Sequence, residues 1–181
     1  MAKHADDLPE LEPDLMQLAE DLLQAAAERD LTLASAESCT GGLIASTLTG
    51  IEGLSSAFNA GFVTYCDAAK ADLLGIPLED IERFGAVSAK IALAMARQAQ
   101  AISGADVAIA VSGYTGPVEG GENGLVHVAA SDNSGREIHE EFHFGEVERN
   151  QGRLLAAAAA MRIFHCAIVK TGDPAAAVKT R

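Results

Sequence analysis

Apolar residues recur at helical spacing in some segments of the first half of the chain and fill short runs in others. From Pro13 to about Arg29 a stripe of this kind predicts an amphipathic helix, formed by Leu15, Leu18, Leu22, Leu23 and Ala26. Residues 31–35 are small and apolar throughout, which indicates a buried strand. Apolar positions return at helical spacing in residues 43–48, so the segment 36–42 joins this strand to a second helix.

The middle of the chain predicts one strand followed by three helices. Residues 57–65 are aromatic and β-branched, which is typical of a strand. Short connecting helices are expected at residues 68–74 and 77–83. A longer, alanine-rich helix follows, with Ser88 as its N-cap and Gly104 as its C-terminal stop.

The last third predicts a central strand, a hairpin and a final helix. Residues 106–112 are apolar on both faces and run into the glycine-rich segment 113–121, which is a natural position for a ligand. Residues 125–130 and 137–144 alternate in polarity around a strong turn signal, so they form a hairpin. The final helix covers about residues 149–169.

This order of elements predicts a three-layer α/β/α sandwich with a mixed, mainly parallel sheet of about five strands. We expect one domain over residues 13–170, between a flexible acidic N-terminus at 1–12 and a flexible tail at 171–181. Ligands usually bind outside the carboxyl ends of the strands in such sheets. That rule would gather the turn at Ser38, the strand end at Tyr65 and the loop after residue 112 on one rim.

Composition narrows the partners of this domain. The chain has 181 residues, of which 49% are hydrophobic, and its formal net charge is −13. We do not expect so acidic a chain to bind nucleic-acid backbones nonspecifically, because such binding needs clustered Lys and Arg side chains. Apolar runs fall short of a membrane span and the N-terminus carries no hydrophobic signal core, so we expect a cytoplasmic protein with no membrane or nucleic-acid partner.

Metal and disulfide chemistry are not expected. Cys39, Cys66 and Cys166 show no paired spacing for zinc or redox work. His139 and His143 are four residues apart, but they fall in a predicted strand, where a solvated face is the simpler interpretation.

Ser38 is the residue that draws attention to the first turn, and its position allows two interpretations. Its hydroxyl can cap the following helix by accepting a backbone N–H. Alternatively it is a nucleophile, at a helix N-terminus that can hold an anion or oxyanion. No histidine stands at the predicted rim, but Tyr65 and Lys70 follow a strand end, and lysine acts as a base when burial lowers its pKa. Cys39 is a rival nucleophile.

Residues 113–121 do not match the nucleotide-binding fingerprints. They lack the Lys-Ser/Thr ending of a P-loop, and their glycine spacing is not G-x-G-x-x-G. Kinase and dehydrogenase functions are therefore disfavoured.

Several ordered segments together carry a family resemblance: Ala36-Glu37-Ser38-Cys39-Thr40-Gly41-Gly42, Gly61-Phe62-Val63-Thr64-Tyr65 followed by Ala69-Lys70, Gly85-Ala86-Val87-Ser88, and Ser112-Gly113 with Gly116-Pro117. At compatible spacing, they resemble the CinA C-terminal domain family, the nicotinamide-nucleotide amidases. The match spans roughly residues 14–169. Several motifs in one order are far more specific than any one of them.

The resemblance implies an α/β/α fold and hydrolysis of the carboxamide of nicotinamide mononucleotide to nicotinate mononucleotide and ammonia, without a metal or cofactor. It assigns the family's serine nucleophile to Ser38, its lysine to Lys70 and its tyrosine to Tyr65. Ser38 would attack the amide carbon while Lys70, alone or through Tyr65, takes the hydroxyl proton.

Substrate binding is expected from two backbone segments and two arginines. N–H groups near residues 40–42 are candidates to hold the oxyanion, and amides of the glycine-rich loop are candidates for the ribose and phosphate. A family signature of glycine, acid and two arginines is loosely matched at the start of the last helix. The candidate substrate-binding residues are Thr40, Gly41, Gly42, Ser112, Gly113, Gly116, Arg149 and Arg153.

The chain also departs from the family pattern. Tyr114-Thr115 stands where the family usually has Ile-Ala, and the loop before the next strand is shorter. These departures keep two alternatives open: a noncatalytic nucleotide-binding paralogue, and an amidase of another small carboxamide. The sequence leaves open whether the chain forms a homo-oligomer.

Overall fold

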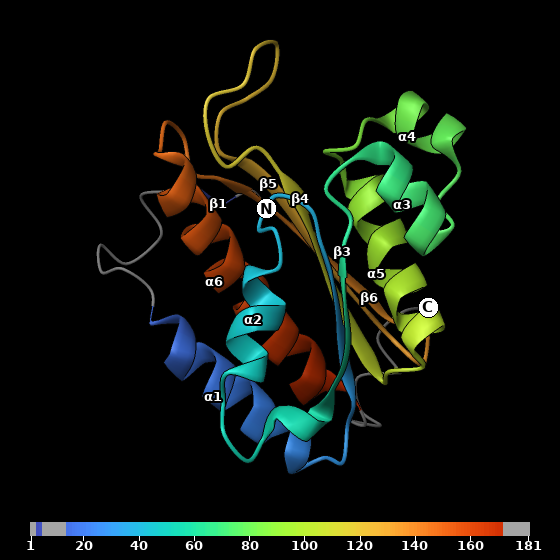
Figure 1. Cartoon of the computed structure of the whole chain (residues 1–181), viewed down its shortest axis with the longest axis vertical. Helices are drawn as coiled ribbons and strands as arrows, with labels where there is room; N and C mark the ends of the chain where they lie inside the picture. Colours follow the sequence, from blue (N-terminus) through green and yellow to red (C-terminus); the bar gives the residue numbers. More distant parts are fainter. Residues whose placement is uncertain (1–2, 5–13, 172–181) are drawn as a thin grey trace.

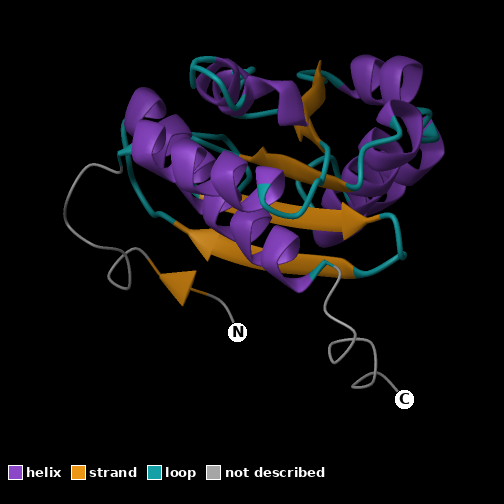
Figure 2. Ribbon diagram, turned by 90° about the horizontal axis from the view of Figure 1, so that it is seen from below, coloured by secondary structure: helices purple, strands orange, loops and turns teal. Residues whose placement is uncertain are grey.

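The structure is a computed structural model that describes residues 3–4 and 14–171. A single mixed sheet lies between two layers of helices (Figures 1 and 2). The strand order is β1-β6-β5-β4-β2-β3. The strands are β1 (Lys3–His4), β2 (Leu33–Glu37), β3 (Phe58–Val63), β4 (Val107–Gly113), β5 (Leu125–Asp132) and β6 (Glu137–His143). The predicted α/β sandwich is confirmed.

Parallel and antiparallel pairings divide the sheet into two parts. β2 pairs in parallel with both β3 and β4, which makes the parallel part. β5 then pairs antiparallel with β4 and β6, which confirms the predicted hairpin. Because β2, β3 and β4 run in the same direction, their carboxyl ends meet on one rim of the sheet.

Helices cover both faces of the sheet. One layer holds α1 (Leu15–Ala27), α2 (Leu43–Thr49) and α6 (Arg149–Lys170), and the other holds α3 (Asp67–Leu74), α4 (Leu78–Phe84) and α5 (Ala89–Ser103) (Figure 1). A short 3-10 helix, η2 (Ser55–Ala57), precedes β3. Ser88 caps α5 by accepting a hydrogen bond from the N–H of Ile91, and Gly104 ends that helix in the left-handed conformation, both as predicted.

The alternation of side chains along β4 explains how the two layers differ. Val107, Ile109 and Val111 face the core shared with α1 and α6, whereas Ala108 and Ala110 face the core shared with α5. Small side chains on that face let the alanine-rich α5 pack close to the sheet. The last helix, α6, is long and apolar enough to cross a membrane by length and composition, but most of it is buried in the core.

Strand β1 was not predicted, and it lies within the N-terminal segment expected to be flexible. Lys3 and His4 pair in parallel with the edge strand β6 at Phe142 and His143. The rest of that segment, and the predicted tail beyond residue 171, lie outside the described residues.

Candidate active site

Ser38 lies at the carboxyl end of β2, and the alternation of the strand decides which way it faces. Leu33 packs in the core with α1 and α6, while Ala34 and Ala36 pack against α5. The N–H of Ser38 still donates to the carbonyl of Val111, so the pairing continues one residue past the strand. Ser38 therefore turns toward the layer that contains α3.

Lys70 reaches Ser38 from that layer. It sits on α3 four residues before Leu74, and both side chains are buried on the inner face of this short helix. Only 1% of Lys70 is exposed. A lysine is almost never buried to this extent unless its amine has hydrogen-bond partners. Its amine donates to Ser38 Oγ at 3.3 Å and to the carbonyl oxygen of Thr64 at 3.1 Å.

The surroundings of Lys70 favour its neutral form. Burial lowers the pKa of the amine below its ordinary value, and Asp67, whose Oδ1 lies 3.9 Å from Nζ, offsets part of that effect. A lysine with a lowered pKa is a stronger candidate for a general base near neutral pH, because more of it carries a free lone pair. Ser38, which is 8% exposed, is the hydroxyl within its reach.

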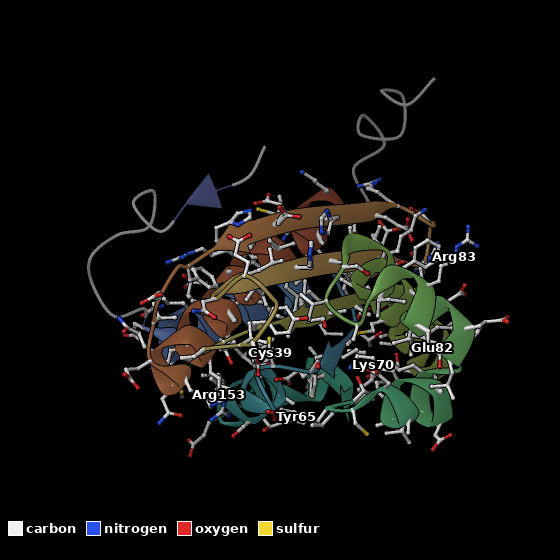
Figure 3. All side chains as sticks on the ribbon, turned by 90° about the horizontal axis from the view of Figure 1, so that it is seen from above. Cys39, Tyr65, Lys70, Glu82, Arg83 and Arg153 are labelled. Carbon is white, nitrogen blue, oxygen red and sulfur yellow. The ribbon has the colours of Figure 1, made fainter. Side chains whose placement is uncertain are left out.

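Ser38 and Lys70 open onto a cavity of about 260 Å³ at the rim where β2, β3 and β4 end. Figure 3 shows Cys39, Lys70, Tyr65 and Arg153 around this end of the sheet. The three predicted signals converge here, since Ser38, Tyr65 and Gly113 all line the cavity. The end of β4 and the loop that follows it form one wall, with residues 112–118.

Tyr65 stands apart from the other two members of the expected set. It lines the cavity but is 64% exposed. Within the described part of the chain, no hydrogen bond joins its side chain to Ser38 or Lys70. The structure therefore brings the serine and the lysine together and leaves the tyrosine at the cavity mouth.

Of the two interpretations of Ser38, the one in which its hydroxyl caps α2 is wrong. The N-cap of α2 is Gly42, which makes no side-chain hydrogen bond, and Ser38 is not at the helix end. The buried Glu37 carboxylate instead accepts the N–H groups of Ile44 at 3.1 Å and Ala45 at 2.8 Å. These two first-turn donors are therefore occupied and are not free to hold a ligand anion.

Thr40 ties the turn after Ser38 to two elements. Its hydroxyl donates to Glu37 Oε2 at 2.7 Å. Its carbonyl accepts Arg153 Nε at 3.2 Å and Nη2 at 2.9 Å, so α6 holds the turn from the other side. Thr40, Gly41, Gly42 and Arg153 are not among the described residues that line the cavity. As substrate ligands they stay predictions, and what the structure gives them is a role in fixing the turn.

The loop after β4 is positioned by close contacts on two sides. Ser112 Oγ donates to the carbonyl of Ala86 at 2.7 Å, which links the end of β4, where the loop begins, to the segment before α5. A Cβ on Gly152 would lie 2.5 Å from the carbonyl oxygen of Thr115, so glycine lets α6 approach the loop backbone. Of the predicted substrate-binding residues, those brought to the cavity are Ser112, Gly113, Gly116 and Arg149.

Cys39 is disfavoured as the nucleophile, and no metal centre emerges. Burial raises the pKa of its thiol to about 12, which leaves it protonated and weakly nucleophilic.

His139 and His143 lie on β6 as predicted, and His139 Nε2 is 3.0 Å from His127 Nδ1. Across residues 3–4 and 14–171 no three His, Cys, Asp or Glu side chains are arranged to hold a metal ion.

Two acidic residues of the site were missed from the sequence. Glu37 was quoted only as part of a motif, although an acid at the end of an otherwise apolar strand is a signal for a buried hydrogen-bond acceptor. Asp67 precedes Lys70 by three residues at the start of α3, a spacing that places the two side chains on neighbouring helix positions.

The fold and the site define a class of small α/β domains that carry a serine and a buried lysine at the carboxyl edge of a mixed sheet. The model of the CinA C-terminal domain family matches residues 15–168. The chain belongs to that family, as its sequence resemblance implied.

Solved structures support this assignment at the level of the whole domain. The competence/damage inducible protein CihA from Agrobacterium tumefaciens is 39% identical, with a TM-score of 0.82 over 90% of this chain and 99% of that one. A CinA superfamily protein from Escherichia coli is 35% identical, with a TM-score of 0.79 over 90% of this chain and 93% of that one.

Curated relatives are longer than this chain. A CinA-like protein from Geobacter sulfurreducens is 46% identical over 122 residues, which are 66% of this chain and 30% of the relative. One from Geobacter metallireducens is 44% identical over 137 residues, 74% of this chain and 33% of the relative. The chain thus matches about a third of the length of these relatives.

Proposed function

We propose that this protein is a serine amidohydrolase that converts nicotinamide mononucleotide to nicotinate mononucleotide and ammonia. The observation that carries the proposal is the 3.3 Å contact between Lys70 Nζ and Ser38 Oγ, which pairs a hydroxyl with a buried amine at a cavity. The substrate is inferred from the resemblance to the CinA family, whose model matches residues 15–168. The relatives' names state only a competence- or damage-inducible family.

In the first half of the reaction, Ser38 Oγ attacks the carboxamide carbon and its proton passes to the neutral amine of Lys70. The tetrahedral intermediate collapses as the C–N bond breaks, and the protonated lysine delivers that proton to the departing ammonia. Ser38 is left as an ester of the nicotinate nucleotide. Lys70 acts directly in this proposal, because Lys70 donates a hydrogen bond to Ser38 Oγ and no hydrogen bond joins Tyr65 to Ser38 within the described residues.

In the second half, water attacks the ester carbon while Lys70 takes a proton from it. The ester bond breaks, Lys70 returns the proton to Ser38 Oγ, and nicotinate mononucleotide leaves. The same amine serves both halves, so the sequence of steps needs one base only. Water enters where ammonia left, at the open side of the cavity.

Backbone donors and one arginine complete the proposed binding. Of the predicted N–H groups at residues 40–42, that of Gly41 already donates to the carbonyl of Ser38, so those of Thr40 and Gly42 remain the candidates to hold the oxyanion. Losing one such donor typically costs about 10² to 10³ in rate. Arg149, at the start of α6, lines the cavity and is the candidate for the substrate phosphate.

The proposal includes a cytoplasmic enzyme that works on a small nucleotide, with no nucleic-acid or membrane partner. A net charge of −13 opposes binding to polyanions, while a local site built on Arg149 still accommodates one phosphate.

A panel of amides, followed by ammonia release, tests the proposal. It should contain nicotinamide mononucleotide, nicotinamide riboside, free nicotinamide and asparagine. We expect turnover of the mononucleotide at ordinary enzymatic rates, and at least a hundredfold lower kcat/KM for compounds that lack the phosphate. No ammonia from any of them would contradict the proposal.

The altered loop after β4 favours a second candidate, a noncatalytic nucleotide-binding paralogue. Tyr114 and Thr115 stand where the family usually has Ile-Ala, and both line the cavity. Saturable binding of nicotinamide mononucleotide without ammonia release would support this candidate. Rapid turnover of another amide in preference to the mononucleotide would instead indicate a different small carboxamide as the substrate.

A further inference from the structure

The charged side chains of the cavity are few and are separated in space. Among the described residues that line it, three carry ionisable charge: Asp67, Lys70 and Arg149. Lys70 is the buried base of the proposed reaction. One anion and one cation therefore remain to contact a ligand.

These two charges come from opposite layers of the fold. Asp67 is the first residue of α3, on the face of the sheet covered by α5, whereas Arg149 is the first residue of α6 on the other face (Figure 1). Asp67 lies on the lysine side, with its Oδ1 3.9 Å from Lys70 Nζ. The cavity is thus negative beside the reacting groups and positive at the start of α6.

The Asp67 carboxylate is not occupied by a structural hydrogen bond within the described part of the chain. Its side chain is 57% exposed, and among the described residues its one close ionic neighbour is Lys70, at a distance longer than a hydrogen bond. The N–H groups at the start of α3 gain no side-chain cap, since Cys66 is the N-cap and makes no such bond. The carboxylate is therefore available to a ligand in the cavity.

We propose that Asp67 selects the substrate by the positive charge of its pyridinium ring. This inference rests on the proposed function and deepens it. In nicotinamide mononucleotide the ring is cationic, the carboxamide is attached to it, and the phosphate is the remote anion. With the carboxamide at Ser38, the ring lies beside Asp67 and the phosphate extends toward Arg149. The ligand class is a dipolar one, a cationic ring joined to an anionic phosphate.

A different role for Asp67 predicts different behaviour. Its charge also raises the pKa of Lys70, so removing it makes the lysine a weaker base at every substrate. That effect changes the pH profile of catalysis and does not depend on the charge of the substrate's ring. Selection by ring charge changes the affinity for a cationic ring and leaves a neutral ring unaffected.

The test compares the oxidised mononucleotide with its reduced dihydropyridine form, which keeps the amide, ribose and phosphate but has a neutral ring. Dissociation constants of both are measured by calorimetry on Ser38→Ala, which lacks the nucleophile and so binds without turnover, and on Ser38→Ala combined with Asp67→Asn or with Asp72→Asn. Asp72 is exposed on the same helix and does not line the cavity, so it controls for lost charge. Ammonia release by the wild type is measured alongside.

We expect Asp67→Asn to weaken binding of the oxidised form about fivefold to tenfold, the size of a partly screened charge pair. Binding of the reduced form by the Asp67→Asn variant, and of both forms by the Asp72→Asn variant, should stay within about twofold of the values for Ser38→Ala alone. An equal loss for both forms, or no loss for either, overturns the role of Asp67 while wild-type ammonia release upholds the proposed function. No binding of the mononucleotide by Ser38→Ala, together with no ammonia release by the wild type, overturns both.

Discussion

Replacing Glu37 by glutamine tests whether one buried carboxylate holds the turn that presents Ser38. The carboxylate accepts four hydrogen bonds: from Ser35 Oγ at 3.3 Å and the Ala45 N–H at 2.8 Å on Oε1, and from Thr40 Oγ1 at 2.7 Å and the Ile44 N–H at 3.1 Å on Oε2. Each oxygen thus receives one hydroxyl and one backbone N–H. A glutamine side chain keeps the shape but replaces one of these acceptors by an NH₂ donor.

The size of the effect follows from that replacement. A hydroxyl can rotate and accept from the new NH₂, whereas a backbone N–H cannot, so one buried donor is left unsatisfied at a cost of about 1–3 kcal/mol. The bonds that remain lose charge assistance, worth about 1 kcal/mol each, while the relief of a buried charge acts in the opposite direction. We expect Glu37→Gln to lower the free energy of unfolding by about 2–4 kcal/mol.

The assay is urea unfolding of the full chain, followed by circular dichroism, with thermal unfolding as a second measurement. A loss of about 3 kcal/mol corresponds to a Tm lower by about 6–12 °C for a domain of this size. Glu52→Gln is the matched control, because Glu52 is exposed in the loop after α2, and it should stay within about 0.5 kcal/mol of the wild type. A Glu37→Gln variant as stable as that control would refute the reasoning.

Two further predictions concern the loop contact and the base. Gly152→Ala places a Cβ against the Thr115 carbonyl, so we expect kcat/KM to fall at least about tenfold as the loop shifts, with the free energy of unfolding within about 2 kcal/mol of the wild type. The control is Gln151→Ala, at an exposed neighbouring position, which should keep full activity. A Gly152→Ala variant with full activity would contradict the packing argument. Neutral Lys70 is the base and its pKa is lowered from the ordinary value of 10.5, so kcat/KM should rise with pH and level off below pH 10.5. Asp67 raises the pKa of Lys70, so Asp67→Asn should move this rise to lower pH. A flat profile of kcat/KM against pH would contradict the assignment of Lys70 as the base.

Local patterns predicted most of the fold because local physics determines those elements. The apolar stripe of α1, the alternation of β5 and β6 and the glycine after α5 each act within a few residues of themselves. Strand β2 was placed two residues early, at 31–35 instead of Leu33–Glu37, because a charged residue looks like a strand end. The burial of Glu37 is favourable only because four donors, two of them on α2, surround its carboxylate in the folded chain.

The candidate site was predicted in its residues more than in its contacts. Ser38 and Lys70 meet because strand alternation turns one and the inner face of α3 turns the other toward the same cavity. Tyr65 belongs to the same motif as Lys70, and Arg153 to the loosely matched signature at the start of the last helix, but the directions of both side chains depend on packing between distant elements. Arg153 accordingly turned out to hold the Thr40 carbonyl, a contact across the fold that no sequence spacing indicates.

The central claim is that Ser38 attacks a carboxamide, and the rate of ammonia release from nicotinamide mononucleotide by Ser38→Ala tests it most directly. Ser46→Ala, the same change at an exposed position on α2, is the control, and circular dichroism verifies that both variants are folded. We predict a rate at least about 10³ lower for Ser38→Ala, as expected when a nucleophile is removed, and an unchanged rate for Ser46→Ala. A folded Ser38→Ala variant that releases ammonia at the wild-type rate would contradict the account.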